Sequence, residues 1–341
     1  MIFPKCMIGR APQITYTGHV LPCCWIPYEK ELEFVDGLSK INPFWREDFN
    51  LYNNKFSDIV DSPEWNTMLE TIYKDTPLKC SIKCSEFTVS KTGKAETGNT
   101  TVPKINPSKT DKQGYIETLS ESQEIFEYTK SKIVDYKKVQ LETTSRCSLK
   151  CPYCQRTVEA GTGKYYKSDL TLEILEDVLT TPYIERIDDC GRYGDPTFYK
   201  QYHEFLDLIA DSNIKKYNMS VAATGRGSNW WKTTIDKFIK IKNTGTIPII
   251  TFGIDGLKDT SNKHRIGQDF DEIWNAMIDC HNAGIKVLWQ VIPTSANEHQ
   301  IEEIKEIADR LGIEIRMVLS NRFRGRDDPL TPVNSDLSYI K

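Results

Sequence analysis

The chain has 341 residues, enough for one large or two modest domains, and ten of them are cysteines. A net charge of −4 argues against a dedicated nucleic-acid-binding protein, and no apolar run is long enough to span a bilayer. The N-terminal residues have no long hydrophobic core, so we expect that they do not form a signal peptide. We therefore expect a cytoplasmic protein whose cysteines are better explained as ligands of metal ions or iron–sulfur clusters than as disulfides.

Residues 1–87 are predicted to form a small cysteine-rich domain. A hairpin with a Thr-Gly turn is expected over residues 13–20, and a helix is expected where Ser62 precedes Pro63. The hairpin would bring two cysteines side by side, and a later pair could complete a site of four thiolates. The four ligands would be Cys6, Cys23, Cys80 and Cys84, with Cys24 as an alternative to Cys23.

Residues 88–116 are predicted to be a flexible linker. They are rich in Thr, Lys, Gly, Asn, Ser and Pro and hold almost no apolar side chains, so they cannot bury enough surface to become ordered. A helix is expected over residues 118–134. We place a larger domain at residues 117–320 and a short C-terminal tail at residues 321–341.

From residue 138 onwards, predicted strands and helices alternate. The strands are expected at 138–144, 184–190, 217–223, 248–254, 286–292 and 313–319. The helices are expected near 171–180, 199–212, 230–243, 270–283 and 298–311. Because several of these strands are almost continuously apolar, the pattern predicts an α/β fold in which helices cover a parallel sheet.

Three cysteines follow the first of these strands within eight residues: Cys147, Cys151 and Cys154. A [4Fe–4S] cluster usually takes four protein ligands, so three thiolates leave one iron open to a small molecule. The Cys-x3-Cys-x2-Cys spacing, with the aromatic Tyr153 before the last cysteine, resembles the signature of the radical S-adenosylmethionine (SAM) enzymes. The resemblance implies a partial (β/α)6 barrel in which SAM binds the open iron, is held in part by Tyr153, and is cleaved to a 5′-deoxyadenosyl radical. On spacing alone, a zinc site is the alternative.

Two later motifs extend the resemblance. Residues 191–196, Gly-Arg-Tyr-Gly-Asp-Pro, stand where the family has the Gly-Gly-Glu-Pro motif that holds the SAM amino group. Gly194 and Asp195 would take that role, with an ordinary Gly-Asp-Pro turn as the alternative. Residues 223–227 resemble the family's Thr-Asn-Gly motif, which implies that Thr224 bonds the carboxylate or ribose of SAM.

Three further SAM contacts are expected at later strand ends. Asp255 is a candidate contact to SAM or substrate, or a turn residue, and Arg265 could form a fork with the SAM carboxylate or a surface salt bridge. Gln290 would face SAM or a buried backbone group. Gly253 stands where relatives often have a serine that contacts the ribose, so that contact is in doubt.

The cysteines of residues 1–87 resemble the SPASM/twitch extension of radical SAM enzymes, which carries auxiliary [4Fe–4S] clusters. Gly18 and the first cysteines fit its opening pattern, but the later spacing departs from it, so one auxiliary cluster is expected. The order also departs, because the extension normally follows the core. A structural zinc ion on the same four ligands remains the alternative.

The resemblance implies an enzyme that abstracts hydrogen from its substrate, with a flavodoxin or ferredoxin as electron donor. A peptide or protein substrate is expected, because relatives with this extension mostly modify peptides; a small molecule or nucleotide is the first alternative. A zinc-bearing, non-catalytic binding protein is the second. Cys190 and Cys280 fit no ligand pattern and are expected to be structural.

Overall fold

The computed structural model describes residues 11–24, 26, 31–33, 38–74, 77, 80, 136–160, 165–320, 322–323, 325 and 327–338. The chain forms two compact units, one from residues 1–13 and 19–137 and the other from residues 14–18 and 138–341. Each unit is described by itself. The predicted linker and the predicted helix at 118–134 lie outside the described residues.

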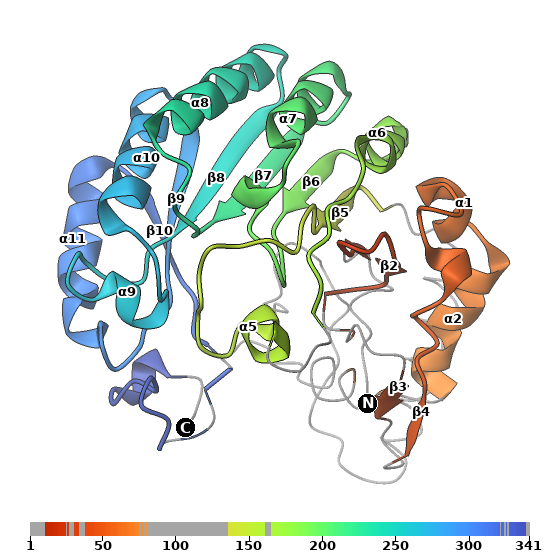
Figure 1. The fold of residues 1–341 in the computed structure, drawn as a ribbon, viewed down its shortest axis with the longest axis horizontal. Coiled ribbons are helices and arrows are strands. Elements are labelled where there is room, and N and C mark those ends of the chain that lie inside the picture. Colours follow the sequence, from red (N-terminus) through yellow and green to blue (C-terminus); the bar gives the residue numbers. More distant parts are fainter. Residues whose placement is uncertain are drawn as a thin grey trace, which may run out of the picture. The chain divides into compact units, whose positions relative to one another are not determined.

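The second unit contains a parallel sheet whose strands lie side by side in the order of the sequence (Figure 1). Its six parallel strands are β5 (Lys138–Leu141), β6 (Arg186–Asp189), β7 (Lys216–Val221), β8 (Ile247–Gly253), β9 (Lys286–Val291) and β10 (Glu314–Met317). At the β5 edge, the backbone N–H of Glu142 donates to the carbonyl of Ile14 at 2.9 Å, so that β1 (Gln13–Ile14) extends the sheet. The predicted α/β fold with a mostly parallel sheet is confirmed.

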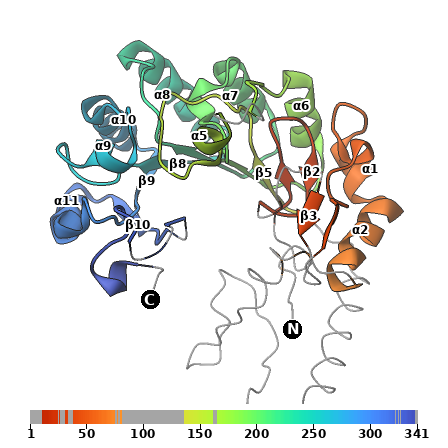
Figure 2. The same ribbon diagram turned by 60° about the horizontal axis from the view of Figure 1, so that its bottom comes forward.

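Helices alternate with these strands as predicted. They are α5 (Gln155–Ala160), α6 (Leu172–Thr180), α7 (Tyr202–Asp211), α8 (Ser228–Asn243), α9 (Ser261–His264), α10 (Phe270–Asn282) and α11 (Ile301–Leu311). Short 3-10 turns occur at η3 (Pro196–Phe198), η4 (Glu298–Gln300) and η5 (Ser335–Leu337). Figures 1 and 2 show α6, α7, α8, α10 and α11 arranged along the outside of the curved sheet. No helix in the described part of the chain is long and apolar enough to cross a membrane.

Aromatic side chains fill the space between the sheet and the helices. Tyr217 of β7 packs edge-on against Phe205 of α7, with ring centroids 5.9 Å apart. Trp289 of β9 makes a similar contact with Trp274 of α10 at 5.3 Å. Since these rings are large and apolar, they supply much of the buried area that holds the helices against the sheet.

The other face of the sheet is more polar. Side chains alternate along a strand, so Asn218 and Ser220 point away from the face that carries Tyr217. Their register partners on β8 are Ile249 and Thr251. The hydroxyl of Thr251 donates to the side-chain oxygen of Asn218 at 3.2 Å. Polar groups that would be costly in a dry core therefore line this face.

The strand ends differ from the predictions in one informative place. The first core strand was expected to reach residue 144, but β5 ends at Leu141. The next residues pair instead with a loop: the N–H of Leu170 donates to Thr143 at 2.9 Å, and the N–H of Ser145 donates to Ser168 at 3.0 Å. The chain therefore leaves the ladder three residues earlier than its apolar pattern predicts.

The first unit contains β2 (Val20–Leu21), β3 (Glu31–Glu33), β4 (Ser39–Ile41), η2 (Glu47–Phe49), α1 (Phe56–Val60) and α2 (Pro63–Lys74). The predicted start of α2 is confirmed, because the Ser62 hydroxyl accepts the N–H of Trp65 at 3.0 Å and Pro63 is the first helical residue. Trp65 is buried against Phe49, and its indole N–H donates to the hydroxyl of Tyr136 at 3.0 Å. This tryptophan is one of the large, fully buried side chains among the described residues of the unit.

Candidate functional site

The three clustered cysteines lie on the loop between β5 and α5. Cys147 accepts the backbone N–H of Leu149 on its sulfur at 3.4 Å. The carbonyl of Cys154 accepts the N–H of Val158 at 3.0 Å and so opens α5. All three thiols are free and partly exposed. One short loop thus presents three free thiols.

A tight turn links the second and third cysteines. The N–H of Cys154 donates to the carbonyl of Cys151 at 3.3 Å, and Tyr153 has φ of 61°. Proline at the second position and positive φ at the third are features of a type II turn, whose third position normally holds glycine or asparagine. Tyr153 is the one non-glycine residue with positive φ in the described ranges. Such strain costs roughly 1–3 kcal/mol and clusters at functional sites.

The cysteine loop is tied to the ends of later strands. The Ser148 hydroxyl donates to the carbonyl of Thr224, just after β7, at 2.8 Å. The N–H of Lys150 donates to the carbonyl of Ile266, after α9, at 2.9 Å. These contacts span more than 70 residues of sequence, so the loop position depends on the completed sheet.

The loop after β6 lies directly against the strand that leads to the cysteines. A Cβ atom on Gly194 would stand 1.9 Å from the carbonyl oxygen of Thr144, so only glycine fits there. The next residue, Asp195, donates its N–H to the carbonyl of Arg146 at 2.9 Å. The carboxyl ends of β5 and β6 are therefore held together.

The buried carboxylate of Asp195 joins β6 to β7. One oxygen accepts the N–H and the hydroxyl of Thr197, at 3.1 and 2.6 Å, and so caps η3. The other accepts the N–H groups of Ala222 and Ala223, both at 2.8 Å. This aspartate thus has four protein donors in addition to any contact with SAM, which stays a prediction.

Thr224 and Glu272 together shape the turn after β7. The Thr224 hydroxyl accepts the N–H of Asp269 at 3.0 Å. The carboxylate of Glu272 on α10 accepts the N–H groups of Gly225, Arg226 and Gly227 at 2.8, 2.9 and 3.2 Å. Sequence reasoning missed Glu272, because it lies 45 or more residues from its partners and belongs to no motif.

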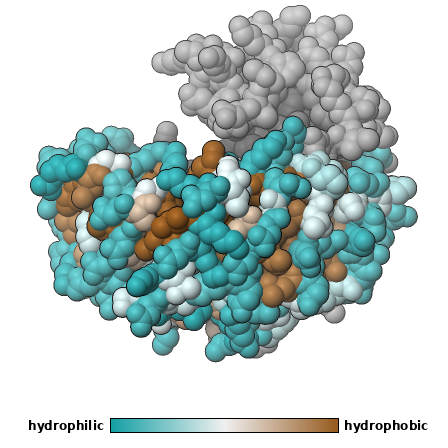
Figure 3. All heavy atoms as spheres, turned by 90° about the horizontal axis from the view of Figure 1, so that it is seen from above, coloured by the Kyte–Doolittle hydropathy of each residue, from teal (hydrophilic) through white to brown (hydrophobic). Residues whose placement is uncertain are grey.

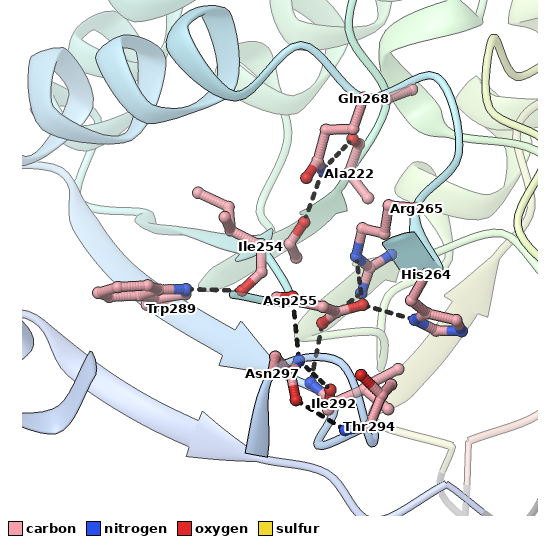
Figure 4. Close-up of polar contacts among 12 residues, drawn as sticks. Ala222, Ile254, Asp255, His264, Arg265, Gln268, Trp289, Ile292, Thr294 and Asn297 are labelled. Atoms are coloured by element: carbon pink, nitrogen blue, oxygen red, sulfur yellow. Dashed lines mark hydrogen bonds and ion pairs between the residues drawn. The ribbon is translucent and has the colours of Figure 1, made fainter. Parts of the chain in front are cut away.

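A buried ion-pair cluster follows β8 (Figure 4). The Asp255 carboxylate lies 2.8 Å from Nδ1 of His264 and 2.8 Å from Nε of Arg265. It also accepts the backbone N–H of Ile292 at 2.8 Å. Although burial opposes ionisation, Arg265 and His264 hold the pKa of Asp255 below its usual value. Asp255 is thus a charged anchor for the segment that carries Arg265.

Two glutamines lie beside this cluster. Gln268 donates its amide N–H groups to the carbonyls of Ala222 and Gly253, at 2.7 and 2.9 Å, and so bridges the ends of β7 and β8 (Figure 4). Its buried side-chain oxygen has no hydrogen-bond partner within the described residues. Gln290 is the register partner of Gly253 on β9, and its side-chain amide makes no hydrogen bond to the described part of the chain. Gln290 remains a predicted SAM contact.

Comparison with known families shows the superfamily of this chain. The family model described as the radical SAM superfamily matches residues 141–311, which include the cysteine loop and the carboxyl ends of β5 to β9. The chain belongs to the radical SAM superfamily. Membership implies a [4Fe–4S] cluster that binds SAM.

Three radical SAM relatives or structures illustrate the likeness. The chain is 26% identical over 217 residues to the tungsten-containing aldehyde ferredoxin oxidoreductase cofactor-modifying protein of Pyrococcus furiosus, covering 60% of this chain and 55% of that protein. SuiB of Streptococcus suis bound to SAM has a TM-score of 0.46 at 15% identity, covering 67% and 51%. AnSMEcpe bound to SAM and the Cp18Cys peptide has a TM-score of 0.43 at 15% identity, covering 57% and 55%. The chain spans about half the length of these proteins.

The cysteine donors fit the cluster of a radical SAM protein. Within the described ranges, no three His, Cys, Asp or Glu side chains converge closely enough for a single metal ion. A structural zinc ion binds four protein ligands around one point, whereas a cubane binds each thiolate at a different iron. Burial raises the pKa of Cys147 to about 12 and of Cys151 to about 11, and the positive charge of bound iron favours the thiolates.

The predicted residues of the radical SAM site meet at the carboxyl ends of the parallel strands. Gly194, Asp195, Thr224 and Asp255 closely follow strands, Gln290 is the penultimate residue of β9, and Tyr153 and Arg265 lie on the longer loops after β5 and β8. The cysteines of the predicted auxiliary site are only partly described. Cys23, Cys24 and Cys80 lie in the first unit, and Cys6 and Cys84 lie outside the described residues. Cys280 is fully buried on α10, in keeping with a structural role.

Proposed function

We propose that this chain is a radical SAM enzyme in which Cys147, Cys151 and Cys154 hold the catalytic cluster. The supporting observation is the strained turn at Tyr153, on a loop of three thiols fastened to the ends of β7 and α9. When bound, the cluster supplies the electron that cleaves SAM to the 5′-deoxyadenosyl radical. In this proposal the curved sheet is the partial (β/α)6 barrel.

The strand ends would bind SAM with different kinds of groups. Thr224 and Gln290 offer a hydroxyl and an amide, while Gly194 brings backbone close to the cysteine loop. Asp195 would accept the SAM ammonium while it fixes the turn after β7. Arg265 offers its remaining N–H groups to the SAM carboxylate, and Asp255 holds it in place.

We infer that the substrate is a peptide or protein, as the family resemblance of the cysteine-rich segment implies. The polar face of the sheet, with Asn218, Ser220 and Thr251, suits hydrogen bonding to a peptide backbone. The name of the Pyrococcus furiosus relative favours a second candidate, a cofactor or another small molecule. We also propose an auxiliary cluster on Cys6, Cys23 or Cys24, Cys80 and Cys84, a flavodoxin or ferredoxin donor, and a cytoplasmic location.

Metal analysis combined with SAM cleavage tests this function. After anaerobic reconstitution with iron and sulfide, we expect about eight irons per chain if both clusters form. Reduction should then release 5′-deoxyadenosine from SAM. Cys151→Ala should abolish release and remove about four irons, whereas Cys280→Ala, outside the predicted ligand sets, should keep both. Zinc in place of iron, or SAM cleavage that survives Cys151→Ala, would contradict the proposal.

The two substrate classes need a separate measurement. Incubation of the reduced enzyme with deuterated candidate substrates should move deuterium into 5′-deoxyadenosine only for the class whose hydrogen is abstracted. Transfer from peptides supports the first class, and transfer from a small-molecule cofactor supports the second. If 5′-deoxyadenosine forms in the same amount with every candidate peptide and never carries deuterium, the peptide assignment is contradicted, although SAM cleavage is intact.

A further inference from the structure

A cavity of about 480 Å³ opens between helices α7 and α8, in a region that the proposed chemistry does not use. Its walls come from the turn after η3, from α7, from the turn after β7 and from α8. The volume is in the range of sites for small molecules. Figure 3 looks onto the molecule from the side of these helices, where hydrophobic residues form short bands between hydrophilic ones.

One wall of the cavity is a rigid aromatic stack. The indole of Trp230 lies over the imidazole of His203, with ring centroids 5.2 Å apart and planes inclined by 27°. The ring of Tyr202 also stacks on Trp230 at 5.7 Å. A stacked wall of this kind holds its shape, so polar groups beside it are positioned before a ligand arrives.

Arg226 enters the cavity without an anionic partner among the described residues. Its Nε donates to the carbonyl of Thr197 at 2.5 Å, and its guanidinium carbon lies 4.4 Å from the centre of the Phe198 ring. Its terminal nitrogens make no hydrogen bond or ion pair within the described residues. Burial lowers the pKa of Arg226, while Asp195 and Glu272 oppose this from a greater distance. A bound anion would compensate this burial.

The other charged groups leave a surplus of positive charge beside Arg226. Asp207 is already paired with Lys237 at 2.6 Å and Lys240 at 3.3 Å. Lys200 is exposed and has no ion pair in the described part of the chain. Glu204 is an exposed acid on the same wall. Among the described residues of these walls, two cations without ion pairs therefore face one acid without an ion pair.

His203 adds no charge to this balance. The Thr234 hydroxyl donates to the carbonyl of Trp230 at 2.9 Å, so it must accept from Nε2 of His203, which lies 2.9 Å away. Burial and the charge of Lys237 lower the pKa of His203, which keeps the ring neutral near pH 7. The Nδ1 atom is then an acceptor, able to take a hydroxyl of a ligand.

We propose that this cavity binds a small oxyanion, a phosphate or a carboxylate, through Arg226 and Lys200. The guanidinium offers two parallel N–H donors, which match the geometry of both groups. Binding there would also act on the turn after β7, because Glu272 holds the backbone N–H of Arg226. The site is thus connected to Thr224, two residues earlier.

Isothermal titration with inorganic phosphate, and separately with succinate, tests the proposal on the full chain at low ionic strength and pH 7.5. We expect saturable binding of at least one probe with one site per chain. Arg226→Gln should weaken it about tenfold or more, and Lys200→Gln about threefold. Glu204→Gln should tighten it about twofold, since it removes a repelling charge. Lys232→Gln, an exposed change on α8 outside the cavity, should leave it unchanged.

The two probes identify the chemical class of the ligand. Binding of phosphate alone assigns a phosphate site, and binding of succinate alone assigns a carboxylate site. Because Lys200 and Glu204 are exposed, their variants should fold even if Arg226→Gln does not. No saturable binding of either probe would overturn the proposal. Equal affinities in wild type, Lys200→Gln and Glu204→Gln would overturn it as well.

Discussion

Arg265 and Asp255 form a buried ion pair, with Nε and a carboxylate oxygen 2.8 Å apart. The two residues lie ten positions apart and follow the same strand, β8. Gly253 makes room for this pair, because a Cβ atom there would stand 2.7 Å from the Arg265 guanidinium. A side chain at position 253 would therefore require the arginine to shift.

Breaking this pair should be costly. Arg265→Gln should lower the free energy of unfolding by about 3–5 kcal/mol, because it leaves the Asp255 carboxylate buried without its main counter-charge. Urea denaturation of the apo-protein measures the change. The matched control is Lys258→Gln, which breaks the exposed pair with Asp271 at 2.6 Å and should cost less than about 1 kcal/mol. If both variants lose a similar free energy of unfolding, the pair between Arg265 and Asp255 is not desolvated.

Gly194 should tolerate no side chain. In Gly194→Ala the new methyl group meets the backbone of Thr144, which cannot move aside as a flexible side chain would. We expect a loss of about 3 kcal/mol or more, together with poor iron uptake at the cysteine loop. Gly245→Ala is the control: Gly245 has φ of 94° but open space around it, so only about 1–2 kcal/mol should be lost. A Gly194→Ala variant as stable as wild type would show that the loops are not in contact.

Local patterns predicted the elements of this fold, but not the contacts between them. The alternation of apolar strands and helices indicated the parallel sheet, and Ser62-Pro63 indicated a helix start, because both signals are local. The early end of β5 could not be predicted, since it depends on pairing with residues 165–170. For a similar reason, the sequence gives no sign that Tyr153 adopts positive φ in a turn that normally prefers glycine.

The candidate site, like the fold, has features that local spacing predicts and features that only the folded chain reveals. Spacing predicted Cys147, Cys151 and Cys154 as cluster ligands, because a cluster loop is short and local, and that assignment stays a prediction. The roles of Asp255 and Glu272 depend on partners that folding brings near, so no spacing rule finds them. For Arg265, a surface salt bridge was the alternative to a SAM contact. Arg265 does form an ion pair, but its partner Asp255 is fully buried and only 11% of the Arg265 side chain is exposed, so the pair does not lie on the surface.

Glu272 should control the order of the turn after β7. Glu272→Ala removes the acceptor of three backbone N–H groups, and we expect faster hydrogen–deuterium exchange at residues 225–227. Stability should fall by about 1–3 kcal/mol. SAM binding should weaken severalfold, because Thr224 belongs to the same turn. Glu303→Ala, an exposed change on α11, should alter none of these. Unchanged exchange at 225–227 would contradict the role of Glu272.

Asp189 should make stability depend on pH. Burial raises its pKa to about 7, although Thr143 and Tyr217 donate hydrogen bonds to it, and the nearby Asp195 raises it further. Between the unfolded pKa near 4 and the folded pKa near 7, the folded chain keeps a proton that the unfolded chain releases. The protonated Asp189 therefore adds to the free energy of unfolding at low pH, and this contribution is lost as pH rises through that range.

Asp189→Asn removes the titrating proton and should remove this loss. Relative to wild type, the variant should become more stable by up to about 2–4 kcal/mol between pH 5 and pH 8, as measured by urea denaturation at both values. Asp236→Asn, on the exposed face of α8, should show the same difference from wild type at both pH values. If Asp189→Asn also shows a constant difference, Asp189 is ionised throughout, and its two hydroxyl donors must outweigh the cost of its burial.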